Sequence, residues 1–172
     1  YVGERSPWDS KKGQIQNVVI GDGVTTIGKD AFNYSSANSE LKTVDLSNAT
    51  SLEKIGIRAF FKCSQLENID LSKAVNLKEI GDNAFNSSGV ENVTFPQNSQ
   101  LTEIGSGVFT LCNNLKNIDI PETVTKIGGS AFERTGLTSI KIPASVTNIG
   151  GTAFYLCGQL ESVTFAPDSK LE

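Results

Sequence analysis

The sequence predicts a mainly β repeat solenoid, and three observations indicate this fold class. An Ile-Gly step, followed by Phe five residues after the Ile, occurs six times in the 172 residues. Successive Ile residues of these steps are separated by 28, 25, 24, 23 and 22 residues. Pairs of apolar residues two positions apart precede each step. A period in the twenties over nearly the whole chain indicates stacked repeats, each too small to bury its own apolar face.

The apolar pairs predict one short strand in each coil, because alternation of apolar and polar residues is the period of a half-buried strand. We expect these strands to run parallel and to form one sheet. They cover residues 17–20, 43–46, 68–71, 92–95, 117–120, 139–142 and 162–165. A polar turn of three or five residues follows, and a second, shorter strand should end at each Ile-Gly step, as in residues 124–127. Two short-stranded faces are therefore expected.

The six Ile-Gly steps should bend the chain toward a turn or single helical turn that contains Ala-Phe. Glycine at this position provides either a positive φ or close contact between two backbones. The recurring phenylalanines should stack as a buried spine along the long axis of the solenoid. They are Phe32, Phe60, Phe85, Phe109, Phe132 and Phe154.

The domain organisation follows from where the period begins and stops. Residues 1–14 are predicted to be an N-terminal cap or flank that folds Trp8 over the first coil, because an open end exposes the phenylalanine spine and a strand ladder. Residues 15–172 are predicted to form a single solenoid of about six repeats. Because the chain begins at Tyr1 and stops early in a repeat, we expect it to be truncated at its C-terminal end and to come from a longer protein.

The three cysteines are predicted to be reduced, buried apolar fillers. Cys63, Cys112 and Cys157 each lie three residues after a spine phenylalanine and are two coils apart. At about 4.8 Å per coil, neighbouring positions are about 10 Å apart, beyond the limit of about 7 Å for a disulfide. The absence of His and of a Cys-x-x-Cys motif argues against a metal or redox role.

Composition argues against several classes of function. A net charge of −4 supplies no basic footprint for nucleic acid or anionic membranes. No apolar run approaches about 18 residues, so we expect no membrane insertion by this chain. The sequence has no histidine, which removes the usual general base and the common nucleophile pairs. Carboxylate pairs remain chemically open, but none lies in an apolar setting. We expect no enzyme activity, cofactor or metal.

The outward positions of the first strands are the candidate binding face. Extended polar surfaces of this kind are used by solenoids for recognition. The competing interpretation is that these positions are polar only for solubility, with Asn side chains bonded to one another along the stack. Asp45 and Asp70 are expected on adjacent strands, which leaves a loosely bound cation open. The candidate residues are Thr43, Asp45, Asn68, Asp70, Asn92, Thr94, Asn117, Asp119, Ser139 and Lys141.

In the second strands, the residues directly before the Ile of each Ile-Gly step predict two ion pairs between neighbouring coils. Lys54 should face Glu79, and Glu103 should face Lys126. Exposed pairs of this kind contribute only about 0–1 kcal/mol each, so we assign them to solubility and register.

The strings Ile-Pro-Glu-Thr-Val-Thr-Lys-Ile-Gly (120–128) and Ile-Pro-Ala-Ser-Val-Thr-Asn-Ile-Gly (142–150), each followed by Ala-Phe, carry a family resemblance. They resemble the BspA-like branch of leucine-rich repeats, a family of bacterial and protozoan surface proteins, and the resemblance extends over about residues 15–171. The sequence departs from the pattern where Ser47 and Ser72 replace the turn proline, where Val108 replaces Ala, and where residues 33–40 are inserted.

The resemblance implies a right-handed leucine-rich-repeat coil at the cell surface or outside the cell. It further implies adhesive binding of proteins, including host matrix proteins such as fibronectin or fibrinogen, by a monomer without a cofactor. Two alternatives stay open: a structural spacer or stalk, and a carbohydrate-binding module of a larger surface protein. The shared residues are those of the core, so binding specificity must come from the outward residues and the variable turns.

Overall fold

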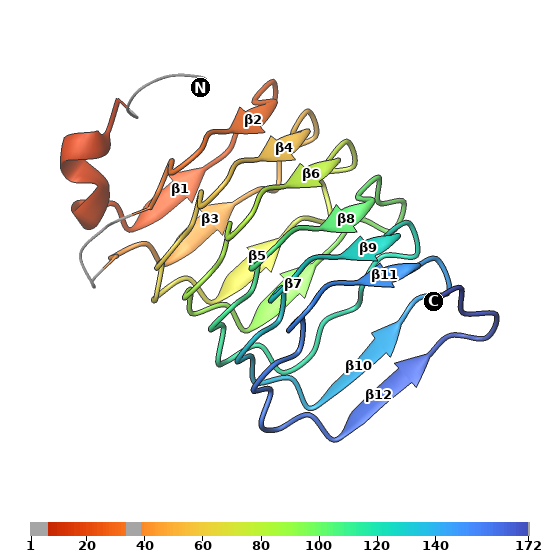
Figure 1. Cartoon of the computed structure of the whole chain (residues 1–172). Helices are drawn as coiled ribbons and strands as arrows, with labels where there is room; N and C mark the ends of the chain where they lie inside the picture. Colours follow the sequence, from red (N-terminus) through yellow and green to blue (C-terminus); the bar gives the residue numbers. More distant parts are fainter. Residues whose placement is uncertain (1–6, 34–38, 172) are drawn as a thin grey trace.

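The computed structural model describes residues 7–33 and 39–171, which form a coil of stacked turns with two rows of parallel strands (Figure 1). The first row contains β1 (Asn17–Val19), β3 (Thr43–Asp45), β5 (Asn68–Asp70), β7 (Asn92–Thr94), β10 (Ser139–Ile142) and β12 (Ser162–Phe165). The second row contains β2 (Thr26–Ile27), β4 (Lys54–Ile55), β6 (Glu79–Ile80), β8 (Glu103–Ile104), β9 (Lys126–Ile127) and β11 (Asn148–Ile149). We number coils 1 to 6 by the Ile-Gly steps that they contain. A 3-10 helix, η1 (Asp9–Gln14), precedes coil 1.

The first row has the predicted parallel strands, but it is not the single sheet that the sequence suggested. Its strands pair as β1-β3, β5-β7 and β10-β12, with Asn17 opposite Thr43 and Asn68 opposite Asn92. Residues 117–120, expected to be a strand, form none, and no ladder joins β3 to β5. The gap after β7 lies where the following turn shortens from five residues (96–100) to three (121–123).

The second row forms two sheets, β2-β4-β6 and β8-β9-β11. Within each sheet the glycine N–H of one coil donates to the isoleucine carbonyl of the preceding coil, as from Gly56 to Ile27 (2.7 Å). No such glycine-to-isoleucine bond joins β6 to β8. The Ser106 N–H instead donates to Oδ1 of Asp82 (2.9 Å). The second row is therefore interrupted between coils 3 and 4.

The glycines of the Ile-Gly steps are needed for close backbone contact, one of the two roles expected for them. A Cβ on Gly56 would lie 2.6 Å from the Lys29 nitrogen, and one on Gly128 would lie 2.6 Å from the carbonyl carbon of Gly105. The positive φ instead occurs three residues after each Ile, and mostly at residues other than glycine. These residues are Asp30, Arg58, Asn83, Gly107, Ser130 and Thr152, with φ between 53° and 65°.

The Ala-Phe turns form a third ladder, which runs through all six coils. In each coil from 1 to 5, the N–H of the spine phenylalanine donates to a carbonyl of the next coil. The acceptors are Ala59, Ala84, Val108, Ala131 and Ala153, at distances of 2.8–3.0 Å. This turn ladder has no interruption, unlike the two rows of strands.

The predicted phenylalanine spine is confirmed. Consecutive rings stack with centroids 5.2–5.7 Å apart and interplanar angles of 4–15°. The four rings of coils 2 to 5 are fully buried, and they belong to Phe60, Phe85, Phe109 and Phe132. Trp8 stacks on Phe32 at 5.4 Å, which confirms its expected position over the first coil.

All three cysteines are free, as predicted, but only two of them are buried. Burial raises the pKa of Cys63 to about 12 and that of Cys112 to about 11. Cys157 is half-buried, contrary to the prediction, because the described residues beyond coil 6 pair with it through β12 but include no further Ala-Phe turn. Among the described residues, no helix has the length and apolar character that crossing a bilayer would require.

Candidate binding face

The first row presents its candidate residues to solvent. All ten are exposed, and the burial of β3 and β5 alternates, with the central Val44 and Ile69 buried and the flanking residues exposed. The strand period thus separates core from surface as the sequence predicts. Each of coils 2 to 6 contributes one pair of outward candidate residues, which we call a rung. The rungs lie over a packed apolar layer.

Side chains on the first position of the rungs bond to one another along the stack. Thr43 Oγ1 donates to Oδ1 of Asn17 (2.7 Å), and Asn92 Nδ2 donates to Oδ1 of Asn68 (2.9 Å). The expected Asn–Asn contact between coils is therefore present. Both bonds follow a backbone pairing of the same residues, so they tie the rungs to the strand register.

The aspartates at the second position bond to the turns that follow them. Oδ1 of Asp45 accepts the Ser47 N–H, and Oδ1 of Asp70 accepts the Ser72 N–H, both at 2.9 Å. The bonds from Ser47 lower the pKa of Asp45 from its ordinary value. No group of three or more Cys, Asp or Glu residues suited to a metal ion occurs in the described ranges 7–33 and 39–171.

A hollow of about 620 Å³ lies at the edge of this face, between coils 4 and 5. Phe95 and Pro96 come from the coil 4 side, while Asp119, Pro121 and Glu122 come from the coil 5 side. Of the residues that line it, Thr94 and Asp119 belong to the predicted face. The turn shortens from five residues to three between these coils, but an equal change between coils 1 and 2 leaves β1 and β3 paired, so turn length alone does not indicate the site. A smaller hollow of about 240 Å³, lined by Glu91, Asn92, Asn114, Lys116 and Asn117, lies at the other end of the same seam.

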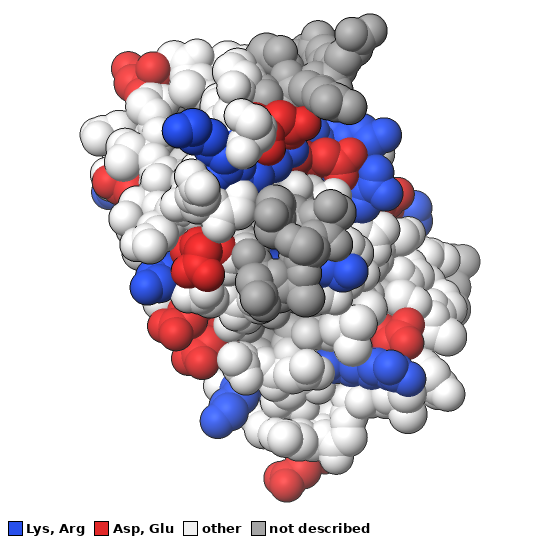
Figure 2. Space-filling view, turned by 90° about the vertical axis from the view of Figure 1, so that its left-hand side faces the viewer, with Lys and Arg blue, Asp and Glu red and all other residues white. Residues whose placement is uncertain are grey.

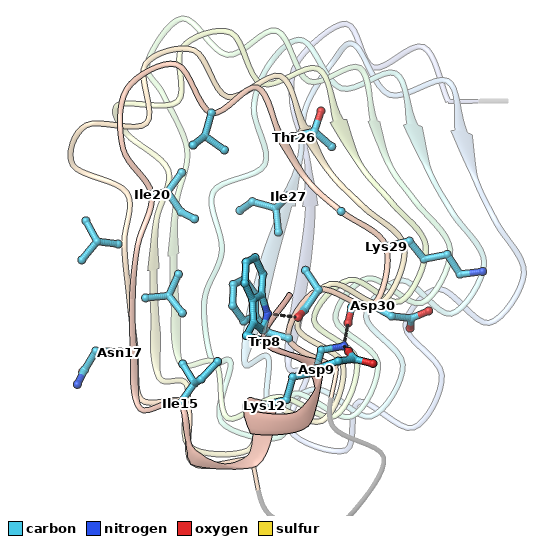
Figure 3. Close-up of a pocket in the computed structure, with 16 residues that line it drawn as sticks. Trp8, Asp9, Lys12, Ile15, Asn17, Ile20, Thr26, Ile27, Lys29 and Asp30 are labelled. Carbon is cyan, nitrogen blue, oxygen red and sulfur yellow. Dashed lines mark hydrogen bonds and ion pairs between the residues drawn. The ribbon is translucent and has the colours of Figure 1, made fainter. Parts of the chain in front are cut away.

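A larger hollow of about 860 Å³ lies at the N-terminal end, between η1 and coil 1 (Figure 3). Trp8 Nε1 donates to the Ala31 carbonyl (2.9 Å), and Lys12 Nζ donates to the Asp30 carbonyl (2.7 Å). These bonds hold η1 against the Phe32 side of the coil. The hollow is formed by the end of the solenoid, and most of its lining residues lie off the rungs.

Charged side chains elsewhere are intermixed rather than gathered by sign. On the side of the molecule that carries η1, Lys and Arg side chains lie among Asp and Glu side chains (Figure 2). The two predicted second-row pairs are confirmed, with Lys54 Nζ 2.7 Å from Glu79 Oε1 and Lys126 Nζ 2.8 Å from Glu103 Oε1. The second row thus has a structural explanation for its charges.

The sequence matches the model of the BspA type leucine rich repeat region in six copies, over residues 10–100 and 37–161. No curated protein matches the chain closely enough to count as a relative. A leucine-rich repeat protein from Bacteroides ovatus is similar in structure, with a TM-score of 0.64 and 28% identity over 91% of this chain and 38% of its own. A leucine rich cell surface protein from Faecalibacterium prausnitzii has a TM-score of 0.60 and 27% identity over 92% of this chain and 49% of its own.

A leucine-rich repeat protein from Eubacterium ventriosum shares the fold, with a TM-score of 0.65 at 21% identity over 95% of this chain and 35% of its own. The chain therefore spans less than half the length of these three proteins. The repeat period, the phenylalanine spine and the family match agree with one another. The chain belongs to the BspA-type leucine-rich-repeat family.

Proposed function

We propose that this chain is a non-catalytic unit of a cell-surface protein and that it binds other proteins through the first-row face and the adjoining turns. The observation that carries the proposal is the exposure of all ten candidate side chains on one side of a packed solenoid. Solenoids use extended surfaces of this kind for recognition. The similar protein from Faecalibacterium prausnitzii is described as a cell surface protein, which supports the same location for this chain.

In this proposal residues 1–14 act as the cap or flank, and residues 15–172 form the binding unit. The unit works as a monomer without cofactor or metal, and its partner is a protein, including matrix proteins such as fibronectin or fibrinogen. The net charge of −4 favours basic patches on such a partner over nucleic acid.

The test is a binding screen of the purified chain against immobilised matrix proteins and glycans. Reversal of three face charges (Asp45→Lys, Asp70→Lys and Asp119→Lys) should weaken binding to the identified protein by at least about tenfold, because charges on a face set partner choice. The matched control reverses three second-row charges (Glu53→Lys, Glu79→Lys and Glu103→Lys) and should leave binding nearly unchanged. Equal loss in both variants would show that only net charge matters.

The alternative role as a spacer is favoured by one observation. The bonds of Thr43, Asn92, Asp45 and Asp70 are made within the face itself, so these groups have a structural role without a partner. A spacer gives no protein or glycan signal in the screen. Binding to a glycan alone would instead identify the carbohydrate-binding alternative.

A further inference from the structure

The seam between coils 4 and 5 lacks a backbone hydrogen bond that two other steps of the first row make and that is also absent between Leu46 and Asp70. Ile20 N–H donates to the Asp45 carbonyl (2.9 Å), and Leu71 N–H donates to the Thr94 carbonyl (2.8 Å). The equivalent groups at the seam are the Phe95 N–H and the Asp119 carbonyl, and neither has a backbone partner in the described part of the chain. A donor and an acceptor of the main chain therefore remain available there.

Both residues line the hollow of about 620 Å³, which we call the coil 4–5 pocket. Its volume lies within the range of about 300–1,000 Å³ that is usual for ligand pockets. Phe95, Pro96 and Pro121 give it apolar walls, Asp119 and Glu122 supply two carboxylates, and no Lys or Arg belongs to its lining. Lys141 Nζ lies 3.8 Å from Glu122 Oε1, but both side chains are about two-thirds exposed, so this pair is weak.

We propose that the coil 4–5 pocket binds a short extended peptide segment of the partner protein that carries a lysine or arginine side chain. This inference rests on the proposed protein-binding function and names the chemistry that the partner must present. The cationic group lies between the carboxylates of Asp119 and Glu122, and its aliphatic stem packs against the apolar walls. The peptide backbone bonds to the Phe95 N–H and the Asp119 carbonyl, as an added strand does at a sheet edge.

The experiment probes an array of immobilised synthetic peptides of random sequence with the labelled chain. Bound peptides should be enriched in Lys or Arg, and the Asp119→Asn/Glu122→Gln variant should bind the strongest of them at least about tenfold more weakly. The matched control is Glu53→Gln/Glu79→Gln, which removes the same charge from exposed positions at the second row, away from the pocket lining. It should change the affinity by less than about twofold.

Three results would overturn the inference: no enrichment of basic residues, equal binding by the Asp119→Asn/Glu122→Gln variant, or equal loss in the control. Thermal melts of both variants exclude loss of folding as the cause. If the pocket variant still binds the protein found in the matrix screen, the pocket inference fails while the proposed function stands. If neither the array nor the screen gives binding, both fail.

Discussion

The two ends of the solenoid differ in what covers their last aromatic ring. At the N-terminal end Trp8 stacks on Phe32 and bonds to Ala31, and Phe32 is only 8% exposed. At the other end the described contacts of Phe154 include a stacked ring on one side only, that of Phe132. Large apolar side chains near it are 44–54% exposed, namely Tyr155, Leu156, Val163 and Phe165. A coil is buried by its two neighbours, and a single aromatic cap substitutes for one of them.

The largest expected effect concerns the interior of the spine. Phe109→Ala should lower the free energy of unfolding by about 3–5 kcal/mol, because its fully buried ring has partners on both sides. Phe154→Ala removes the same atoms from a half-buried position with one stacked ring, so its loss should be clearly smaller. Phe61→Ala, which lies off the spine, is a second control. Equal shifts of all three variants in urea titrations would contradict the stacked spine.

The cap itself should give an intermediate effect. Trp8→Ala removes a partly buried indole and its bond to Ala31, and we expect a loss of about 1–2 kcal/mol. Amide hydrogen exchange should quicken first in coil 1, for example at the Phe32 N–H, and remain unchanged in coil 6. The matched control is Tyr155→Ala at the uncovered end, which should cost less than about 0.5 kcal/mol. Uniform quickening along the chain would argue against a local cap.

The ion pair next to the cap should give a smaller, pH-dependent effect. Burial acts to raise the pKa of Asp30, but hydrogen bonds from Arg58 and Asn33, with the charges of Arg58 and Lys29, outweigh it and lower the pKa. Because the folded-state pKa is depressed, this contribution is present above the unfolded pKa and is lost as the pH falls through the folded pKa. Asp30→Asn should therefore make the free energy of unfolding less dependent on pH below about pH 4, where an Asp titrates.

The control for this prediction is Glu161→Gln, at an exposed position in the last described coils. This substitution should leave the decrease of the free energy of unfolding at acidic pH nearly unchanged. The measurement is urea unfolding of the three proteins at pH 2.5 to 7. An Asp30→Asn curve parallel to that of the parent chain over this range would refute the assignment.

The smallest effect is expected in the reactivity of the three cysteines, which is compared in the chain without any substitution. Cys157, half-buried next to the uncovered end, should react first with a thiol reagent at pH 8. Cys63 and Cys112 should remain protected, because burial excludes the reagent and raises the pKa of both thiols far above this pH. In denaturant all three should react. Reaction of Cys63 before Cys157 would contradict the lower burial that we assign to the C-terminal end of the solenoid.

The sequence was sufficient for features that depend on residues at fixed positions in each repeat. The spine and the Lys54–Glu79 pair follow from the period alone, and the Trp8 cap follows from the need to cover the open end of the spine. The positions of positive φ did not, because Arg58, Ser130 and Thr152 are not residues that favour a left-handed backbone. The interruptions of the two rows were missed as well. They depend on the offset between neighbouring coils, which the period does not contain.

The same distinction applies to the binding face. The outward direction of Asp45 or Asn92 follows from strand alternation, and it was predicted correctly. The coil 4–5 pocket lies where two coils meet without strand pairing, and its residue Phe95 occupies a position that is apolar in every repeat, so no surface pattern marked it. Its role required the geometry between coils.

The uninterrupted turn ladder has a mechanical consequence. The first row is broken after β3 and after β7, and the second row is broken after β6, while the bonds between the Ala-Phe turns continue through every coil. Bending can open the strand rows at these breaks while the turn edge keeps its length. The molecule is thus stiff along one edge and compliant on the two others, and a pulling force along its axis is borne mainly by the edge that holds the phenylalanines.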